Sequence, residues 1–433
     1  MAMFRDDPPV RAEQWQDAAM IRSNRIAVGL AAALIGLVAA GCSSTGSTSS
    51  NPSTPTVVRP ASDPMFPQSK QDAFQQTLNK SLAKLPGTRG AMVAIWTPGT
   101  GKWLGTAGTS NPATNAAVDP ASFFRIGSQT KPFTVTLLLQ LVDQGKLSLN
   151  DNISKWFPNL PDANQITVKQ LTDMTSGIKS YTTNPIFLKR WTANPSNLQI
   201  PPDELIALGT SLPRAFAPGT SMLYSDTNTV MVGRIVEMVS GNSFVTQLQD
   251  NLLKPLGLSD TSYPQPISNT SIPDPHPQGF TMQAVKKPTD ATNWNPSIAS
   301  FSGEMISTME NMQVWIHELG TGATLTPATF AERANIPLGP GNKGYGIGMF
   351  SLGGWLGHNG SIPGFTSVGL YNPQNNTVIV ISAFSDICNP SSCEDSPAMT
   401  MFAQFAQLPE LAAAAPSGSA SSTATASATA SKS

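Results

Sequence analysis

The chain is organised around Phe123-Phe124-Arg125-Ile126-Gly127-Ser128-Gln129-Thr130-Lys131, which leads directly into an apolar run from Phe133 to Val142. That run is apolar on nearly every side, which is typical of a buried helix rather than a surface helix. Residues three apart on a helix share a face, so we expect Lys131 beside the Ser128 hydroxyl. Pro132 is compatible with a first helical turn. The pattern predicts a buried helix from Ser128 to near Gly145.

The pairing of Ser128 with Lys131 suggests a nucleophile and its base. A serine hydroxyl needs a base within hydrogen-bond reach, and burial of a lysine favours its neutral amine form. Two other S-x-x-K strings begin at Ser81 and at Ser176, but they lie in an amphipathic segment and in a turn. The alternative is that Ser128 only caps a helix.

The ends of the 433-residue chain have the composition of targeting and linker segments. Residues 1–41 contain a basic stretch and an apolar run that predict a signal region, with Met20 as a second candidate start. Cys42 follows in a lipobox-like context, which predicts lipid attachment and membrane anchoring; a cleaved signal or a short membrane anchor is the alternative. We expect residues 42–67 to be a Ser/Thr/Pro-rich tether, residues 68–411 the folded domain, and residues 412–433 a disordered tail.

Few other functions are suggested by the composition. The net charge is −1 and only 12% of residues are charged, which argues against nucleic-acid binding. The three histidines lie far apart in the sequence, so we expect no metal site and no cofactor. With Cys42 lipidated, Cys388 and Cys393 remain as an even pair, for which an exported protein favours a disulfide over two free thiols.

Strand patterns occur near both ends of the predicted domain, with a helix-and-loop region from Leu147 to about Pro264 between them. This order predicts one sheet built from the two chain ends and an inserted helical lobe. The expected strands are 91–96, 102–107, 345–352, 367–371 and 377–384.

Two further motifs carry polar groups suited to catalysis. Tyr224-Ser225-Asp226 precedes an expected helix, and a tyrosine there can pass a proton to a leaving group; the alternative is a packed tyrosine with Asp226 as helix cap. His358-Asn359-Gly360-Ser361 lies between expected strands. There Gly360 permits close substrate approach, and the Ser361 and Ser128 amides can form an oxyanion hole; the alternative is a glycine-rich turn.

Taken in order, these three motifs resemble those of the serine β-lactamase and D-alanyl-D-alanine carboxypeptidase superfamily, in its class C β-lactamase-related branch. The resemblance spans about residues 70–408. It implies an α/β (α+β), β-lactamase/transpeptidase-like fold, with an antiparallel sheet, flanking helices and a mainly helical insert. It also implies that Ser128 is the acylated nucleophile, that Lys131 and Tyr224 share proton transfer, and that His358 replaces the K-T-G lysine.

Two departures from the family pattern affect the expected chemistry. Asp226 stands where Asn is commoner, and a carboxylate near Lys131 favours the ammonium form, which shifts the expected acylation base toward Tyr224. An unperturbed histidine at position 358 would lose its charge near about pH 6.5.

We therefore expect an exported serine hydrolase that works through an acyl-enzyme at the extracytoplasmic face of the membrane. Cell-wall peptides ending in D-Ala-D-Ala are the first expected substrates, esters or amides the second and β-lactams the third. A non-catalytic, penicillin-binding or wall-sensing module is the alternative of another class. We expect a monomer that binds a peptide or small acyl substrate.

Overall fold

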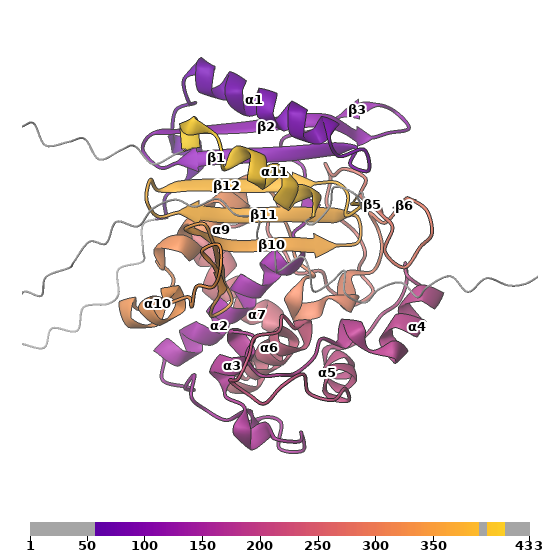
Figure 1. Cartoon of the computed structure of the whole chain (residues 1–433), viewed down its shortest axis with the longest axis vertical. Helices are drawn as coiled ribbons and strands as arrows, with labels where there is room; N and C mark the ends of the chain where they lie inside the picture. The colour runs from indigo at the N-terminus through magenta and orange to yellow at the C-terminus, as the bar shows by residue number, and fades with distance from the viewer. Residues whose placement is uncertain (1–56, 389–395, 412–433) are drawn as a thin grey trace, which may run out of the picture.

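A large antiparallel sheet forms the upper part of the molecule in Figure 1. The computed structural model describes residues 57–388 and 396–411. The sheet has eight strands in the order β3-β2-β1-β12-β11-β10-β9-β8. Its strands are β1 (Gly90–Thr97), β2 (Gly101–Asn111), β3 (Ala116–Ala117), β8 (Lys343–Tyr345), β9 (Phe350–Leu352), β10 (Trp355–Ile362), β11 (Phe365–Asn372) and β12 (Thr377–Ala383). Because β1 pairs with β12, the prediction of a sheet built from both chain ends is confirmed.

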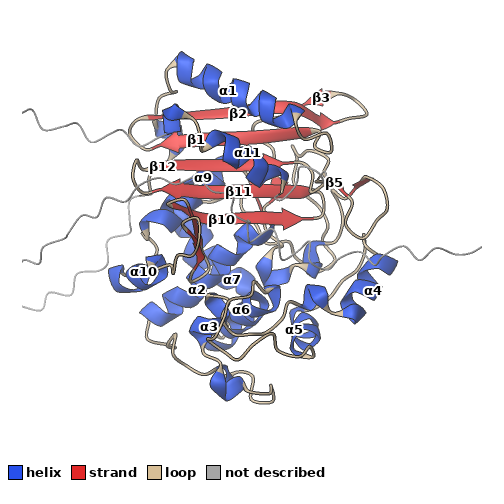
Figure 2. Cartoon of the chain, viewed as in Figure 1, coloured by secondary structure: helices blue, strands red, loops and turns tan. Residues whose placement is uncertain are grey.

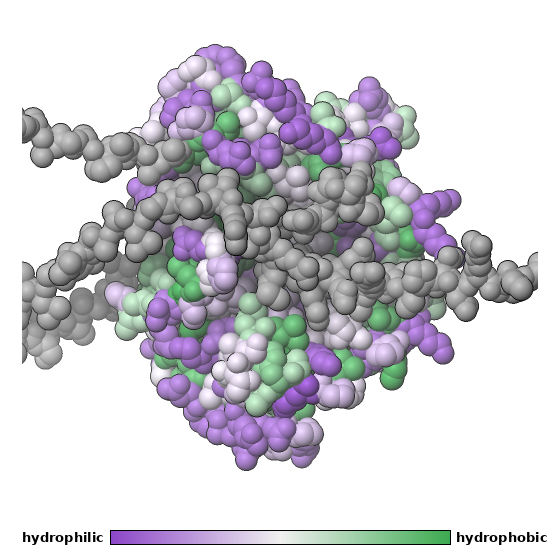
Figure 3. Space-filling model, in the orientation of Figure 1, coloured by the Kyte–Doolittle hydropathy of each residue, from purple (hydrophilic) through white to green (hydrophobic). Residues whose placement is uncertain are grey.

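Both faces of the sheet are covered by helices. On one face lie α1 (Gln68–Ala83) and α11 (Pro397–Phe405), and on the other lie α9 (Met309–Thr321) and α2 (Thr130–Asp143). Alternate residues of β1 therefore enter two different cores, and the strand is apolar at every position from Ala91 to Trp96. The outward side of α1 is hydrophilic in Figure 3, as expected for an amphipathic helix.

A helical lobe lies below the sheet (Figure 2). It is inserted between two short strands, β4 (Phe124–Arg125) and β7 (Ile306–Ser307), which pair with each other. The lobe confirms the predicted insertion. Besides α2, it contains α3 (Val168–Thr172), α4 (Pro185–Ala193), α5 (Pro202–Thr210), α6 (Asp226–Ser240), α7 (Phe244–Leu248) and α8 (Lys254–Leu256). The described residues also contain the short strand pair β5 (Phe280–Thr281) and β6 (Thr289–Asp290) and the helix α10 (Pro327–Ala334).

Some boundaries differ from the sequence prediction. The single strand expected at 345–352 is wrong, because a turn closed by Gly346 N and Met349 O, at 2.8 Å, separates β8 from β9. The helix expected from Ser128 begins at Thr130, after a 3-10 turn at Gly127–Gln129, and ends at Asp143.

The predicted signal region, Cys42, Cys393 and the C-terminal tail lie outside the described residues, as does the tether up to residue 56. Cys388 is disulfide-bonded. Within residues 57–388 and 396–411, none of the helices combines the length and apolar character that crossing a bilayer requires.

Candidate active site

Ser128 lies in the 3-10 turn between β4 and α2, where its side chain is partly exposed. Two side chains hold this turn against the sheet. Gln129 Nε2 donates to Ser367 Oγ at 2.6 Å, and Ser367 Oγ donates to the Ile126 carbonyl at 2.8 Å. The alternative that Ser128 merely caps α2 is not observed, since Gln129 occupies the cap position and no side chain caps it.

The turn is pressed against the backbone of β10. Gly127 has φ +55°, and a β-carbon there would lie 2.7 Å from the Ser361 nitrogen. A β-carbon on Gly360 would lie 1.9 Å from the Ile126 carbonyl oxygen, so both positions require glycine. Since β9 pairs with β10 only over Trp355–Gly357, the second half of β10 is left to face this turn. The structure therefore packs the turn that carries Ser128 against the backbone of Ser361. Ser361 lies on strand β10 and not in the glycine-rich turn that was the alternative.

Lys131 is completely buried, and its amine contacts three oxygen atoms. Lys131 Nζ lies 3.0 Å from Ser128 Oγ, 2.6 Å from Asp226 Oδ1 and 3.0 Å from the Ser302 carbonyl oxygen. Burial lowers the pKa of Lys131 below its ordinary value, while the charge of Asp226 and its hydrogen bond act in the opposite direction. The net direction is downward, so the neutral amine is more accessible than in an exposed lysine.

Tyr224 and Asp226 approach the same amine from the start of α6. The Tyr224 ring centroid is 4.7 Å from Lys131 Nζ, and the Ser128 side chain lies close enough to the Tyr224 hydroxyl to lower its pKa slightly against the larger opposing effects. Burial, followed by the charge of Asp226, raises the pKa of Tyr224 well above its usual range. Asp226 does not cap the helix, because Ser225 occupies the cap position; its second oxygen accepts from Ser180 Oγ at 3.2 Å.

His358 lies on β10 with only 1% of its surface exposed. Its Nδ1 is 2.6 Å from the Asn359 carbonyl oxygen, which accepts only a proton-bearing nitrogen. Nε2 is then the acceptor for the Tyr345 hydroxyl at 3.2 Å. Burial, with Lys131 second, lowers the pKa of His358 from 6.5 to about 3, so the ring is neutral at physiological pH. The sequence expectation of a charge lost near about 6.5 does not hold at this buried position.

The structure thus gathers all the motif residues predicted from the sequence around Ser128. The sequence analysis missed Tyr345, Ser180 and the Ser302 carbonyl. Every residue has a carbonyl group, so no sequence signal could have identified the one at Ser302, whereas Tyr345 at the start of an expected strand facing His358 could have been considered. Among the described residues, no group of three or more His, Cys, Asp or Glu side chains could hold a metal ion.

Comparisons with known proteins agree with this geometry. A protein-family model described as Beta-lactamase matches residues 78–400. The putative penicillin-binding protein PbpX of Bacillus subtilis is 25% identical over 275 residues, which cover 63% of this chain and 64% of that protein. Protein flp of Staphylococcus aureus strain N315 is 30% identical over 281 residues, which cover 61% of this chain and 53% of that protein. The chain therefore spans less than two thirds of either relative.

Among solved structures, a D-stereospecific amidohydrolase from Streptomyces sp. superimposes with a TM-score of 0.69 at 29% identity, covering 77% of this chain and 98% of that one. The D-amino acid amidase from Ochrobactrum anthropi SV3, complexed with L-phenylalanine amide, gives a TM-score of 0.66 at 25% identity, with coverage of 77% and 98%. A penicillin-binding protein from Bacillus halodurans, at 20% identity and a TM-score of 0.63, covers 78% of this chain and 99% of its own and shares the fold.

Proposed function

Because the chain belongs to the beta-lactamase family, whose model matches residues 78–400, we propose that it is a serine hydrolase that becomes acylated on Ser128. The observation that carries this proposal is the 3.0 Å contact between Lys131 Nζ and Ser128 Oγ, made by a lysine with no exposed surface. A neutral amine has two N–H groups, which can donate to Asp226 and to the Ser302 carbonyl. Its lone pair then faces the Ser128 hydroxyl and can take the proton as the serine attacks.

Tyr224 is assigned to proton donation. With its pKa raised well above the usual range, the phenol stays protonated at neutral pH and is a poor base. The acylation base is therefore Lys131 rather than Tyr224, the opposite of the preference drawn from Asp226 alone. The Tyr224 hydroxyl lies beside the Ser128 side chain and passes its proton to the leaving group as the acyl-enzyme forms, and the proton that Lys131 took from Ser128 then restores the phenol. In the same proposal, the amides of Ser128 and Ser361 stabilise the oxyanion.

The preferred substrate is an amide of a D-amino acid. A free carboxylate is bound most strongly by a cation, but His358 is neutral and the Lys131 amine already contacts Asp226. A leaving group without a carboxylate does not need such a cation. This choice is supported by the similarity to the D-stereospecific amidohydrolase and to the D-amino acid amidase, at 29% and 25% identity.

The second candidate is a D-alanyl-D-alanine carboxypeptidase. It is favoured by the similarity to the putative penicillin-binding protein of Bacillus subtilis. For either substrate, we also propose lipid attachment at Cys42 and a location at the outer face of the membrane. Both rest on the sequence of residues 1–67.

Substrate comparison tests the proposal. The full chain and its Ser128→Ala variant are assayed with D-phenylalaninamide, its L enantiomer, a peptide ending in D-Ala-D-Ala and a chromogenic cephalosporin. We expect ammonia release from the D-amide by the wild type only. Release of D-alanine with no amide hydrolysis would favour the carboxypeptidase, and rapid cephalosporin turnover a β-lactamase. The absence of both turnover and covalent labelling of Ser128 would refute the proposal that the chain is a serine hydrolase.

A further inference from the structure

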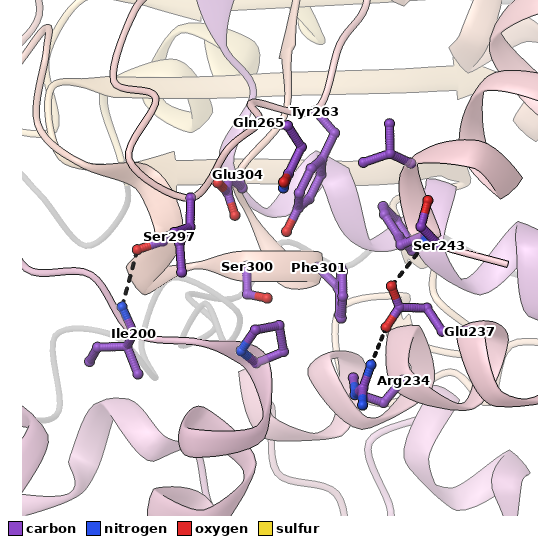
Figure 4. Close-up of a pocket in the computed structure, with 14 residues that line it drawn as sticks. Ile200, Arg234, Glu237, Ser243, Tyr263, Gln265, Ser297, Ser300, Phe301 and Glu304 are labelled. Atoms are coloured by element: carbon purple, nitrogen blue, oxygen red, sulfur yellow. Dashed lines mark hydrogen bonds and ion pairs between the residues drawn. The ribbon is translucent and has the colours of Figure 1, made fainter.

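A cavity of about 420 Å³ borders the Ser300–Glu304 segment within the helical lobe (Figure 4). The same segment supplies the Ser302 carbonyl that accepts from Lys131, but no motif residue of the candidate active site lines the cavity. Its walls come from the start of α5, from α6 and α7, and from the loops that follow α8 and precede β7. The lining residues are Ile200, Pro202, Arg234, Glu237, Ser243, Phe244, Val245, Tyr263, Gln265, Ile267, Ser297, Ser300, Phe301 and Glu304.

Glu304 is the more deeply buried of the two acids that line the cavity. Only 3% of its surface is exposed, and within the described part of the chain it forms no salt bridge. The Tyr263 hydroxyl lies near its carboxyl group and lowers the pKa of Glu304, against the larger effect of burial. The field of Arg125 also reaches this carboxyl, but the hydrogen bonds of Arg125 Nη2 go to backbone carbonyls, including that of Thr270 at 2.7 Å. A buried carboxyl of this kind is stabilised by a cation that enters with a ligand.

The other charged groups of the lining are already paired. Glu237 receives a hydrogen bond from the Phe244 amide at 2.9 Å and forms an ion pair with Arg234. Arg234 also contacts Asp203 at 2.7 Å. The residues that line the cavity therefore carry a net negative charge when the Glu304 carboxyl is ionised.

Three aromatic rings line the same cavity as this carboxyl. The centroids of Phe244 and Phe301 are 4.6 Å apart, and Tyr263 lies 5.2 Å from Phe244 and 5.9 Å from Phe301. In Figure 4, Glu304 and Tyr263 lie on one side of the cavity, with Phe301 close to them. Aromatic faces combined with a carboxylate attract organic cations, because the ring quadrupole and the negative charge act in the same direction.

We propose that this cavity binds a small organic ammonium ion, whose nitrogen contacts Glu304 and whose apolar part packs on Phe244, Phe301 and Ile200. The volume accommodates a ligand of one ring with a short side chain. This site is distinct from the Ser128 site and does not depend on the activity proposed for it.

The test compares benzylamine with benzyl alcohol, its neutral analogue, by isothermal titration calorimetry on the full chain. We expect saturable binding of benzylamine and affinity for the alcohol that is roughly tenfold or more weaker, since a charge-assisted contact is lost. Equal affinities, or no saturable binding of the amine, would overturn the proposal.

Variants locate the binding. Glu304→Gln keeps the shape of the side chain and should reduce benzylamine affinity by the same factor. Glu310→Gln is the matched control, because Glu310 is exposed and does not line the cavity, and the benzylamine affinity of this variant should be unchanged. Unaltered binding in Glu304→Gln would place the amine elsewhere and refute the site. Should that variant not fold, the comparison of the two probes on the wild type still decides.

Discussion

Replacing Asp226 by Asn should shift the pH dependence of acylation toward acid. Asp226 Oδ1 is 2.6 Å from Lys131 Nζ, and only 16% of the Asp226 side chain is exposed, so solvent screens the pair weakly. A carboxylate this close raises the pKa of a neighbouring cation by about 1–3. Its removal leaves burial unopposed and lowers the pKa of Lys131 further. At a pH below the wild-type pKa, each further drop of the Lys131 pKa by about 1 then raises the fraction of neutral amine about tenfold.

The assay is the pH profile of the acylation rate constant, measured with a nitrophenyl ester between about pH 5 and about pH 9. The acid limb of the Asp226→Asn profile should move to a pH lower by about 1–3. Ser180→Ala is the control, since it removes the 3.2 Å hydrogen bond to Asp226 but keeps the negative charge, and its limb should stay close to that of the wild type. An acid limb that does not move in Asp226→Asn, or that moves upward, would show that Lys131 is not the titrating base.

Three other outcomes follow from the geometry. Gly127→Ala should abolish turnover, because the new methyl group would lie 2.7 Å from the Ser361 nitrogen. Gly145→Ala, at a similar φ of +68° with nothing within 4 Å, should keep its turnover and lower the free energy of thermal unfolding by only about 1 kcal/mol. Equal losses of turnover and stability in the two variants would contradict the clash. Since the pKa of His358 is about 3, KM for carboxylate-bearing substrates should be flat from about pH 5 to about pH 8, and a rise near neutrality would show a charged histidine. Burial raises the pKa of Glu304 from 4.5 to about 7, so the folded state binds this proton more tightly and the stability of the wild type should fall as pH rises through that window. The loss of stability should reach up to about 3 kcal/mol and should be absent from the thermal unfolding of Glu304→Gln. Identical pH profiles of the wild type and the variant would argue against the raised pKa.

Local sequence patterns were sufficient for much of the architecture. The Ser128–Lys131 spacing predicted two side chains on one face, and the structure places Nζ 3.0 Å from Oγ. The apolar runs at 91–96 and 377–384 predicted strands, and these strands pair with each other at the centre of the sheet. Such patterns succeed because hydrophobic periodicity depends on neighbours only a few residues away. The pattern at 345–352 failed, because the apolar residues on both sides outweigh the turn signal of Gly346 and Gly348, which lie in the turn that divides β8 from β9.

By itself, the sequence of this chain determined which residues are candidates for chemistry and the order of strands and helices along the chain. Only the tertiary structure decided how those candidates are charged. Lys131 meets Asp226 across 95 positions of sequence and the Ser302 carbonyl across 171, and His358 becomes neutral because several elements pack around it. The physical reason is that the protonation state of a buried group depends on desolvation and on the charges that folding brings near it, and both arise from contacts between distant segments.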